Sequence, residues 1–323
     1  MLSAALTPLP RIPYLRLRFT LRAEEPARLP PYKGSTLRGG FGHALRKTVC
    51  VMGPGQPCLT CLVRRTCVHT RLFETYMEIL PPPFLRGLPT VPRPYVFEPL
   101  TEACDLAPGD PLDFDLLLFG QAADLFGYAL LAVDRMAAAG LGRGRARFAL
   151  DRVRALAPDG TWTLLAEAGR LRTAETPRPL LPPLDAPAGA SGVLGVLHFL
   201  TPTRLKVREH VAPEVTFREL VFLMLRRTLE IATVHLPGAA VDWSLQPYLE
   251  GASAIRATPS LRWHDWERYS NRQGRRMTLG GFLGTLALEG DLAPFIPLLR
   301  TAEILHVGKG ATFGLGRVEL ISC

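Results

Sequence analysis

The first half of the chain alternates between segments with a two-residue hydrophobic period and segments with a helical period. Strict alternation of apolar and polar residues predicts strands, and apolar residues three and four positions apart predict helices. Gly140 follows the second helical segment, as is common at a helix C-terminus. The predicted order is strand, helix, strand, strand, helix, strand, at 13–24, 36 to about 49, 94–100, 111–120, 121–139 and 145–156, with an added strand at 161–168.

A proline-rich segment separates this half from a second half with the same order. Residues 176–192 contain five prolines in 17 positions, which is typical of a linker. Two βαββαβ units predict an α+β fold of two tandem ferredoxin-like, RRM-like domains, at 1–175 and 193–323. The second unit is predicted from a strand at 192–207, a helix at 214–235, a hairpin at 253–270 and 275–290, a helix at 291–304 and a strand at 317–321.

The charge balance favours a polyanionic partner. The chain contains 38 Lys and Arg against 29 Asp and Glu, a formal net charge of +9. An excess of this size most often indicates nucleic acid, and the alternative is a surface rich in arginine with no such role. Hydrophobic residues make up 47% of the chain, which is enough for two real cores.

Neither a leader peptide nor a membrane span is expected. The first eleven residues lack a basic start, and no apolar run approaches the roughly 18 residues of a transmembrane helix. We therefore expect a soluble, cytoplasmic protein with no membrane partner. In that compartment its cysteines are expected to be thiols or metal ligands rather than disulfides.

Four cysteines form a cluster in an insertion at 50–67 of the first domain. Cys58 and Cys61 have the C-x₂-C spacing of a metal-binding knuckle, and Cys50 and Cys67 flank them. Four thiolates would suit a structural zinc ion with no open position for water, and His69 is a candidate replacement ligand. An iron–sulfur cluster and reduced free thiols are the alternatives.

A glycine-rich segment, HVGKGATFGLGRVEL, lies near the C-terminus at 306–320. Glycines permit positive φ and bring backbone N–H groups close to a phosphate. The segment is neither a Walker loop nor a Rossmann fingerprint, because Phe313 replaces the third glycine and a strand-like run follows. On these residues alone, a hairpin turn and a phosphate-binding loop are equal alternatives.

Several segments together resemble one family. They are GSTLRGGFGHALRKTVC near the start, HFLTPTRLK after the linker, MTLGGFLGTLALEGDLAPFIPLL and, above all, HVGKGATFGLGRVEL. These segments are similar to the CRISPR-associated RAMP-superfamily endoribonucleases that process precursor CRISPR RNA. The cysteine cluster followed by LFE is similar to the longer members. The glycine-rich loop is shared with RAMP subunits that do not cut RNA.

The resemblance implies cleavage of CRISPR repeat RNA with no catalytic cofactor. The 2′-OH upstream of the scissile phosphate would attack it and leave a 2′,3′-cyclic phosphate and a 5′-OH. This chemistry needs a base, an acid and positive charge near the phosphorane. The family often places its histidine on or near the first helix, which points to His43, with Lys47 one turn further and Tyr32 before the helix. A solvated or packing role is the alternative for His43, and His264 is the second candidate.

Basic residues among aromatic ones mark the expected RNA path. Arginine binds phosphates and stacks on bases, and aromatic rings stack on unpaired bases. The segment 260–277 has this composition, and the alternative interpretation of it is a hairpin with a solvated charged face. Arg204 and Lys206 are expected on one strand face, and His306 could also reach RNA. The predicted RNA-binding residues are Arg38, Arg46, Arg204, Lys206, His264, Arg268, Arg272, Arg275, Gly308, Lys309, Gly310 and Arg317.

Three functions remain open from the sequence. The first is the endoribonuclease, and the second is a RAMP subunit that binds CRISPR RNA within an effector complex without cutting it. Other CRISPR effector subunits are candidate partners in both cases. The third is a zinc-stabilised RNA-binding regulator outside CRISPR.

Overall fold

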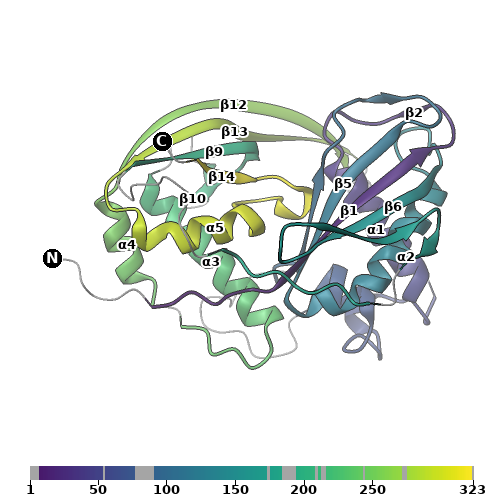
Figure 1. Ribbon diagram of the computed structural model, residues 1–323, viewed down its shortest axis with the longest axis horizontal. Coiled ribbons are helices and arrows are strands. Elements are labelled where there is room, and N and C mark those ends of the chain that lie inside the picture. Colours follow the sequence, from purple (N-terminus) through teal and green to yellow (C-terminus); the bar gives the residue numbers. More distant parts are fainter. Residues whose placement is uncertain are drawn as a thin grey trace. The chain divides into compact units, whose positions relative to one another are not determined.

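The computed structural model describes residues 7–53, 55–76, 91–172, 175–183, 194–207, 210–211, 216–242, 244–270 and 275–321 (Figure 1). The chain divides into two compact units. One unit comprises Ile12–Leu181 and Val234–Gly238, and the other comprises Met1–Arg11, Pro182–Thr233 and Ala239–Cys323. The boundary after Leu181 falls within the predicted linker.

The first unit is built on a six-stranded antiparallel sheet with the order β3-β5-β1-β6-β7-β8. The order β3-β5-β1-β6, with one helix after β1 and another after β5, is that of a ferredoxin-like βαββαβ unit, as predicted. A short pair, β2 with β4, lies apart from this sheet. The elements are β1 (Tyr14–Ala23), β2 (Ala27–Arg28), α1 (Gly34–Val49), β3 (Tyr95–Pro99), β4 (Asp105–Leu106), β5 (Pro111–Phe119), α2 (Phe126–Ala139), β6 (Phe148–Leu156), β7 (Trp162–Glu167) and β8 (Arg170–Leu171).

The helices α1 and α2 pack on one face of this sheet (Figure 1). Alternate residues of β1, Leu17, Phe19 and Leu21, are fully buried in the core beneath them. Phe41 of α1 joins this core and packs edge-on against Phe97 of β3, with ring centroids 5.3 Å apart. The alternate apolar residues of the strands and the apolar stripe of α1 therefore pack together in one core.

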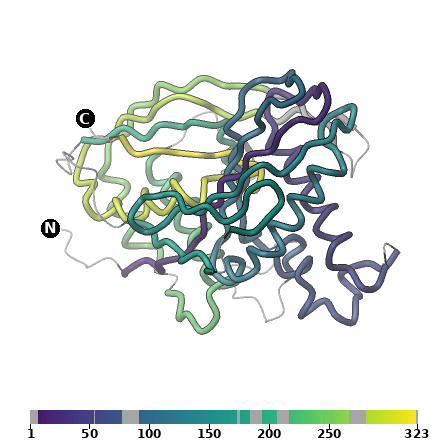
Figure 2. The backbone as a smooth tube through the Cα atoms, turned by 45° about the vertical axis from the view of Figure 1, so that its right-hand side comes forward, coloured from purple at the N-terminus to yellow at the C-terminus, as the bar shows by residue number. Residues whose placement is uncertain are grey.

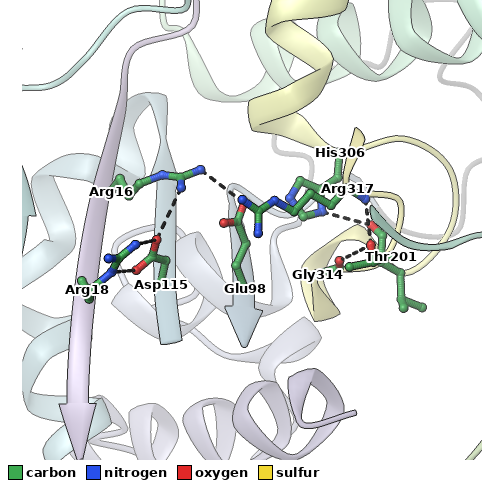
Figure 3. A network of polar contacts seen from close by, with 9 residues as sticks. Arg16, Arg18, Glu98, Asp115, Thr201, His306, Gly314 and Arg317 are labelled. Carbon is green, nitrogen blue, oxygen red and sulfur yellow. Dashed lines mark hydrogen bonds and ion pairs between the residues drawn. The ribbon is translucent and has the colours of Figure 1, made fainter. Parts of the chain in front are cut away.

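The opposite face of the same sheet carries balanced charges (Figure 3). Arg18 Nε donates to Asp115 Oδ1 at 2.8 Å, and Arg16 reaches both Asp115 and Glu98, at 3.4 and 3.3 Å. The guanidinium of Arg18 also lies 4.4 Å from the ring centre of Trp162. The two carboxylates are almost completely buried, so these arginines neutralise buried charge rather than offer an open cationic surface.

The second unit repeats the topology on a four-stranded antiparallel sheet with the order β12-β13-β9-β14. Leu220 of α3 and Leu298 of α5 pack on Phe199 and Leu286 of the sheet. The short strands β10 and β11 pair with each other. The elements are β9 (Leu194–Thr203), β10 (Lys206–Val207), β11 (His210–Val211), α3 (Phe217–His235), α4 (Gln246–Ser253), β12 (Arg256–Ser270), β13 (Arg275–Glu289), α5 (Ile296–Leu305) and β14 (Val318–Ile321).

Short helical turns of other types complete both units. 3₁₀ turns at Gly120–Leu125 and Ala293–Phe295 lead into α2 and α5, and two more lie at Cys58–Thr60 and Ala311–Phe313. A π-helical turn spans Thr70–Glu74.

The longest structural element is the hairpin of β12 and β13, which run side by side in Figure 2. Each strand has 15 residues, so the hairpin is about 50 Å long. Its pairing with β9 covers only residues 282–289 of β13. The hairpin predicted at 253–270 and 275–290 is confirmed, and the part of it that does not pair with β9 is a two-stranded ribbon.

One strand is shorter than predicted and one helix was not predicted. The strand expected at 192–207 ends at Thr203, because the backbone then turns to meet the glycine-rich segment: the Arg204 carbonyl accepts the Lys309 N–H at 2.9 Å. The unpredicted helix α4 is short and begins with a proline at its second position. None of the helices in the described ranges combines the length and apolar character needed to cross a membrane.

Candidate functional site

The outward face of α1 carries an exposed histidine and an exposed lysine. His43 and Lys47 are both exposed and lie four residues apart, so they occupy the same face of the helix. Leu37, Phe41 and Leu45 bury the opposite face. An imidazole beside an ammonium group is a combination that can move a proton next to an anionic substrate.

Gly39 lies one turn before His43 on the same outward face. It was not predicted from the sequence as part of the candidate site. A Cβ built on Gly39 would meet nothing within 4 Å, so packing gives no reason for a glycine there. By contrast, a Cβ on Gly42 would lie 2.1 Å from the Phe73 ring. A mid-helix glycine on open surface costs stability without a structural return. Its position leaves the backbone beside His43 accessible.

Tyr32 does not join His43 and Lys47. It precedes the first residue of α1, Gly34, and nine residues separate Gly34 from His43. At 1.5 Å per residue, this is about 14 Å along the helix axis. The expected convergence of the three side chains is therefore wrong, because the helix is continuous between them.

Two of the predicted RNA-binding arginines are engaged within the protein. The Arg38 guanidinium lies 4.6 Å from the ring centre of Phe73, facing the core side of α1. Arg46 donates from Nη2 to the Gln56 carbonyl at 2.6 Å, which ties α1 to the cysteine insertion. Both residues therefore position α1 and its neighbours.

The four cysteines of the insertion line one small cavity. It has a volume of about 20 Å³, room for about one water-sized body, and His69 also lines it. Burial raises the pKa of the Cys58 thiol, although the positive charge of Arg46 opposes the shift. Burial also lowers the pKa of His69, which keeps its imidazole neutral and able to ligate a metal.

Two side chains of this cavity, Cys58 and His69, have a geometry that fits the ligands of one zinc ion. Cys58 Sγ lies 3.6 Å from His69 Nδ1, which is about the separation of a sulfur and a nitrogen bound to one tetrahedral zinc. The Cys50 thiol lies 3.5 Å from the Gly53 carbonyl instead. Within the described parts of the chain, no three His, Cys, Asp or Glu side chains lie close enough together to hold a metal ion.

The glycines of the C-terminal loop are required by contacts within the chain. Gly308, Gly310 and Gly316 all have positive φ. A Cβ on Gly316 would lie 1.8 Å from the Val307 carbonyl oxygen, and one on Gly308 would lie 2.5 Å from that of Arg204. The space that a Cβ would take is therefore filled by the protein itself. Gly308 and Gly310 are half-buried, and their contact with RNA stays a prediction.

Side chains and backbone fasten the same loop to β9 (Figure 3). His306 is buried, and its Nδ1 donates to the Leu315 carbonyl at 3.1 Å, so it holds the loop and does not face a ligand. The Thr201 hydroxyl donates to the Gly314 carbonyl at 2.8 Å and accepts the Arg317 N–H at 2.9 Å. These hydrogen bonds fix the conformation of the loop and hold it against β9.

The loop brings three basic residues from distant parts of the sequence to the end of β9. Arg204 follows β9, exposed Lys309 hydrogen-bonds to its carbonyl, and Arg317 is held beside Thr201. We call Arg204, Lys309 and Arg317 the basic loop cluster. The expected pairing of Arg204 with Lys206 on one strand is wrong, because β9 ends before both of them at Thr203 and Lys206 begins the separate strand β10.

The β12–β13 ribbon exposes polar and aromatic side chains where they are described. Arg262 and His264 are exposed, and Trp263, 48% exposed, donates its indole N–H to Asp265 at 2.8 Å. Arg272 lies outside the described residues, as do the side chains of Lys206, Arg268 and Arg275, whose backbone is described in strands.

Two family models match the chain. The N-terminal domain model AF_1859_N matches residues 11–177, and the model of CRISPR-associated endoribonuclease Cas6 matches residues 197–318. The two matches together cover both compact units. Comparison with curated protein sequences finds no match.

The chain is similar in fold to several solved Cas6 structures. A product complex of a Thermus thermophilus Cas6 is 18% identical with a TM-score of 0.55, over 96% of this chain and 99% of that one. Another structure of Thermus thermophilus Cas6 is 16% identical with a TM-score of 0.51, over 97% and 100%. A partial Cas6–RT–Cas1–Cas2 complex is 14% identical with a TM-score of 0.57, over 98% of this chain and 47% of that one. At these identities the likeness shows a shared fold.

Proposed function

Because the chain belongs to the Cas6 family of CRISPR-associated endoribonucleases, we propose that it cuts CRISPR repeat RNA at the outward face of α1. His43 transfers the proton, and Lys47 stabilises the charge that develops on the phosphate. The observation that carries this assignment is the exposed His43–Lys47 pair on a helix face left open by Gly39.

The proposed reaction needs no metal. The 2′-OH upstream of the scissile phosphate loses its proton to a base and attacks phosphorus. The new O2′–P bond replaces the O5′–P bond, and the leaving 5′-oxygen takes up a proton from an acid. His43 acts in one of these proton transfers, because its exposed imidazole can either accept or donate a proton. The Lys47 ammonium stabilises the phosphorane by charge.

The basic loop cluster supplies sequence-independent contacts to the RNA backbone. Lys309 is exposed on the loop, and the loop holds Arg204 and Arg317 nearby. Contacts of this kind set the register of the RNA without reading bases. On the ribbon, His264 and the partly exposed ring of Trp263 offer stacking surfaces for unpaired bases.

His43→Ala tests the assignment, with His264→Ala as the matched control. We expect His43→Ala to slow single-turnover cleavage of the cognate repeat RNA by about 10²- to 10⁴-fold, with RNA affinity within a few-fold of the wild type. His264→Ala should retain the chemical rate. If His43→Ala cleaves normally and His264→Ala does not, the site belongs on the ribbon.

A RAMP subunit that holds CRISPR RNA without cutting it is the alternative function. It predicts tight binding of the repeat RNA and no cleavage by the wild-type protein. One structure with the same fold is a complex of Cas6 with RT, Cas1 and Cas2, and other CRISPR proteins are the partners we propose for this chain.

We propose in addition that the cysteine cavity holds a structural zinc ion. Cys58 and His69 have the separation of two zinc ligands, and Cys61 and Cys67 line the same cavity. The ion would tie the insertion to the end of α1. Purified protein never exposed to chelator should contain about one zinc per chain, and Cys58→Ser should lose both metal and thermal stability. Cys104→Ser is the control, since Cys104 is not among the residues that line the cavity. Metal-free protein of unchanged stability would contradict the proposal.

A further inference from the structure

A second cavity in the first unit is lined mostly by polar groups, and no residue of α1 is among its described lining residues. Its volume is about 100 Å³, enough for several water molecules. All the residues that line it belong to one compact unit. Three arginines line it, Arg64, Arg65 and Arg71, and no Asp or Glu appears among its described lining residues.

Thr75 lies in this cavity with an unusual backbone and an unsatisfied hydroxyl. It caps the π-helical turn Thr70–Glu74 with φ 48° and ψ 83°, a left-handed conformation that a β-branched residue rarely adopts. The turn closes through a hydrogen bond from the Thr75 N–H to the Thr70 carbonyl at 2.6 Å. Thr75 is only 4% exposed, and its Oγ1 is buried without a hydrogen-bond partner among the described residues.

A strained residue that buries an unsatisfied hydroxyl is costly unless a ligand compensates it. Inserted single π turns are often found at functional sites. Here the turn places Thr75, with its unsatisfied hydroxyl, in the lining of a cavity that the protein leaves open. These facts together indicate that a ligand completes the site.

The other lining groups define the chemistry of that ligand. Gln121 and Tyr76 add uncharged hydrogen-bonding groups. Burial raises the pKa of Tyr76, so its hydroxyl remains a donor at neutral pH. The Thr70 hydroxyl is already engaged within the chain, because its donor faces the carbonyls of Arg64 and Cys67. Several donors and three guanidinium groups suit a ligand that offers only acceptors and carries negative charge.

We propose that this cavity is a phosphate-binding site, in which Thr75 Oγ1 and the guanidinium of Arg71 hold the phosphate oxygens. Arg64 and Arg65 add positive charge around it. A phosphate matches the cavity better than a carboxylate does, because its oxygens can accept from donors on several sides. The phosphate can belong to the backbone of bound RNA or to a free phosphate compound, and both sources use the same contacts. The site goes beyond the proposed cleavage and does not depend on His43.

Two variants and one control test the site. Thr75→Val keeps the shape and the branching of the side chain and removes the hydroxyl. Arg71→Ala removes an exposed guanidinium, so it is not expected to unfold the protein. Arg170→Ala removes an exposed arginine of β8 that is not among the residues lining the cavity, which controls for the loss of one positive charge.

Thermal unfolding in sodium phosphate, against sodium chloride of equal ionic strength, gives the first readout. Titration of the repeat RNA at several salt concentrations gives the second. We expect phosphate to raise the melting temperature of the wild type and of Arg170→Ala. The melting temperatures of Thr75→Val and Arg71→Ala should be the same with and without phosphate. Without phosphate, Thr75→Val should melt no lower than the wild type, because a methyl group replaces an unsatisfied hydroxyl.

The RNA titration separates the two sources of phosphate. If the RNA backbone is the source, both variants bind repeat RNA more weakly, and Arg71→Ala lowers the slope of log K against log salt by about 0.7. If a free phosphate compound is the source, both variants lose the phosphate effect and keep the affinity for RNA. Cleavage of RNA that is already bound should persist in both variants, which distinguishes this site from the His43 assignment. The proposal is overturned if both variants show the same phosphate effect and the same affinity for RNA as the wild type.

Discussion

Replacing Gly39 with alanine should make the protein more stable and less active at the same time. Gly39 lies mid-helix in α1 on the exposed face, and a Cβ there would occupy open space. Alanine in place of an exposed mid-helix glycine gains about 0.5–1 kcal/mol in the free energy of unfolding. For a unit of this size the gain corresponds to a rise in Tm of about 1–4 °C.

The same methyl group would stand one turn from His43 on the surface where we propose the RNA lies. If the RNA backbone approaches α1 there, the methyl displaces it from His43. A displacement of about 1 Å can cost 10²-fold in rate, so we expect single-turnover cleavage to fall roughly ten- to a hundredfold. A purely structural role for this helix face predicts a stability gain with no change in rate.

Gly127→Ala is the matched control for this experiment. Gly127 lies in α2, is exposed, and likewise has nothing within 4 Å of the position that a Cβ would take. It should show a stability gain of the same sign and an unchanged rate of cleavage. Thermal unfolding and single-turnover cleavage of all three proteins decide the matter. A stabilised Gly39→Ala that cleaves as fast as the wild type would refute the idea that RNA approaches α1 closely at this turn.

The remaining predictions concern charge and backbone geometry. Lys47→Ala should reduce the single-turnover rate by about 10²-fold and Lys47→Arg should restore most of it, because the role is electrostatic; equal rates for all three proteins would remove Lys47 from the site. Gly316→Ala should lower the free energy of unfolding by about 2 kcal/mol or more in denaturant titrations, since a Cβ there lies 1.8 Å from a backbone oxygen at positive φ; a wild-type midpoint would contradict this geometry. Lys309→Ala should weaken binding of unrelated RNAs alike and reduce the salt slope by up to about 0.7–0.9; an unchanged slope would exclude a phosphate contact by Lys309.

The elements of both units were largely predictable from hydrophobic periodicity. The helix predicted from 36 to about 49 is α1, Gly34–Val49, which begins two residues earlier; its apolar stripe and its neighbours in the core agree. The strand predicted at 111–120 is β5, Pro111–Phe119. Local pattern and tertiary packing point to the same answer in these segments, so the pattern is sufficient.

The parts that escaped prediction depend on contacts between distant residues. The strand expected at 192–207 stops at Thr203, because the loop a hundred residues later hydrogen-bonds to Arg204. The glycine spacing at 306–320 is plain in the sequence, but only the structure shows that the chain's own backbone fills the space beside Gly316. Thr75 gives no signal in the sequence, because its interest lies in its backbone conformation and its unsatisfied hydroxyl.

The candidate site was predictable only in part. The positions of His43 and Lys47 on one face follow from their spacing, whereas the grouping of Tyr32 with them fails on the length of the helix. Arg38 and Arg46 resemble solvated basic residues in the sequence, yet one stacks on Phe73 and the other donates to a loop carbonyl. Side-chain direction, which a single sequence does not record, decides these cases.

The most direct test of the central claim is to identify the ends that the wild-type protein leaves on its cognate repeat RNA in excess EDTA. We expect efficient cutting at one position, with a 2′,3′-cyclic phosphate on the upstream fragment and a 5′-OH on the downstream fragment by mass spectrometry. His43→Ala, measured alongside, should leave the RNA bound and intact. Cleavage that stops in EDTA, or products with a 3′-OH and a 5′-phosphate, would contradict the account.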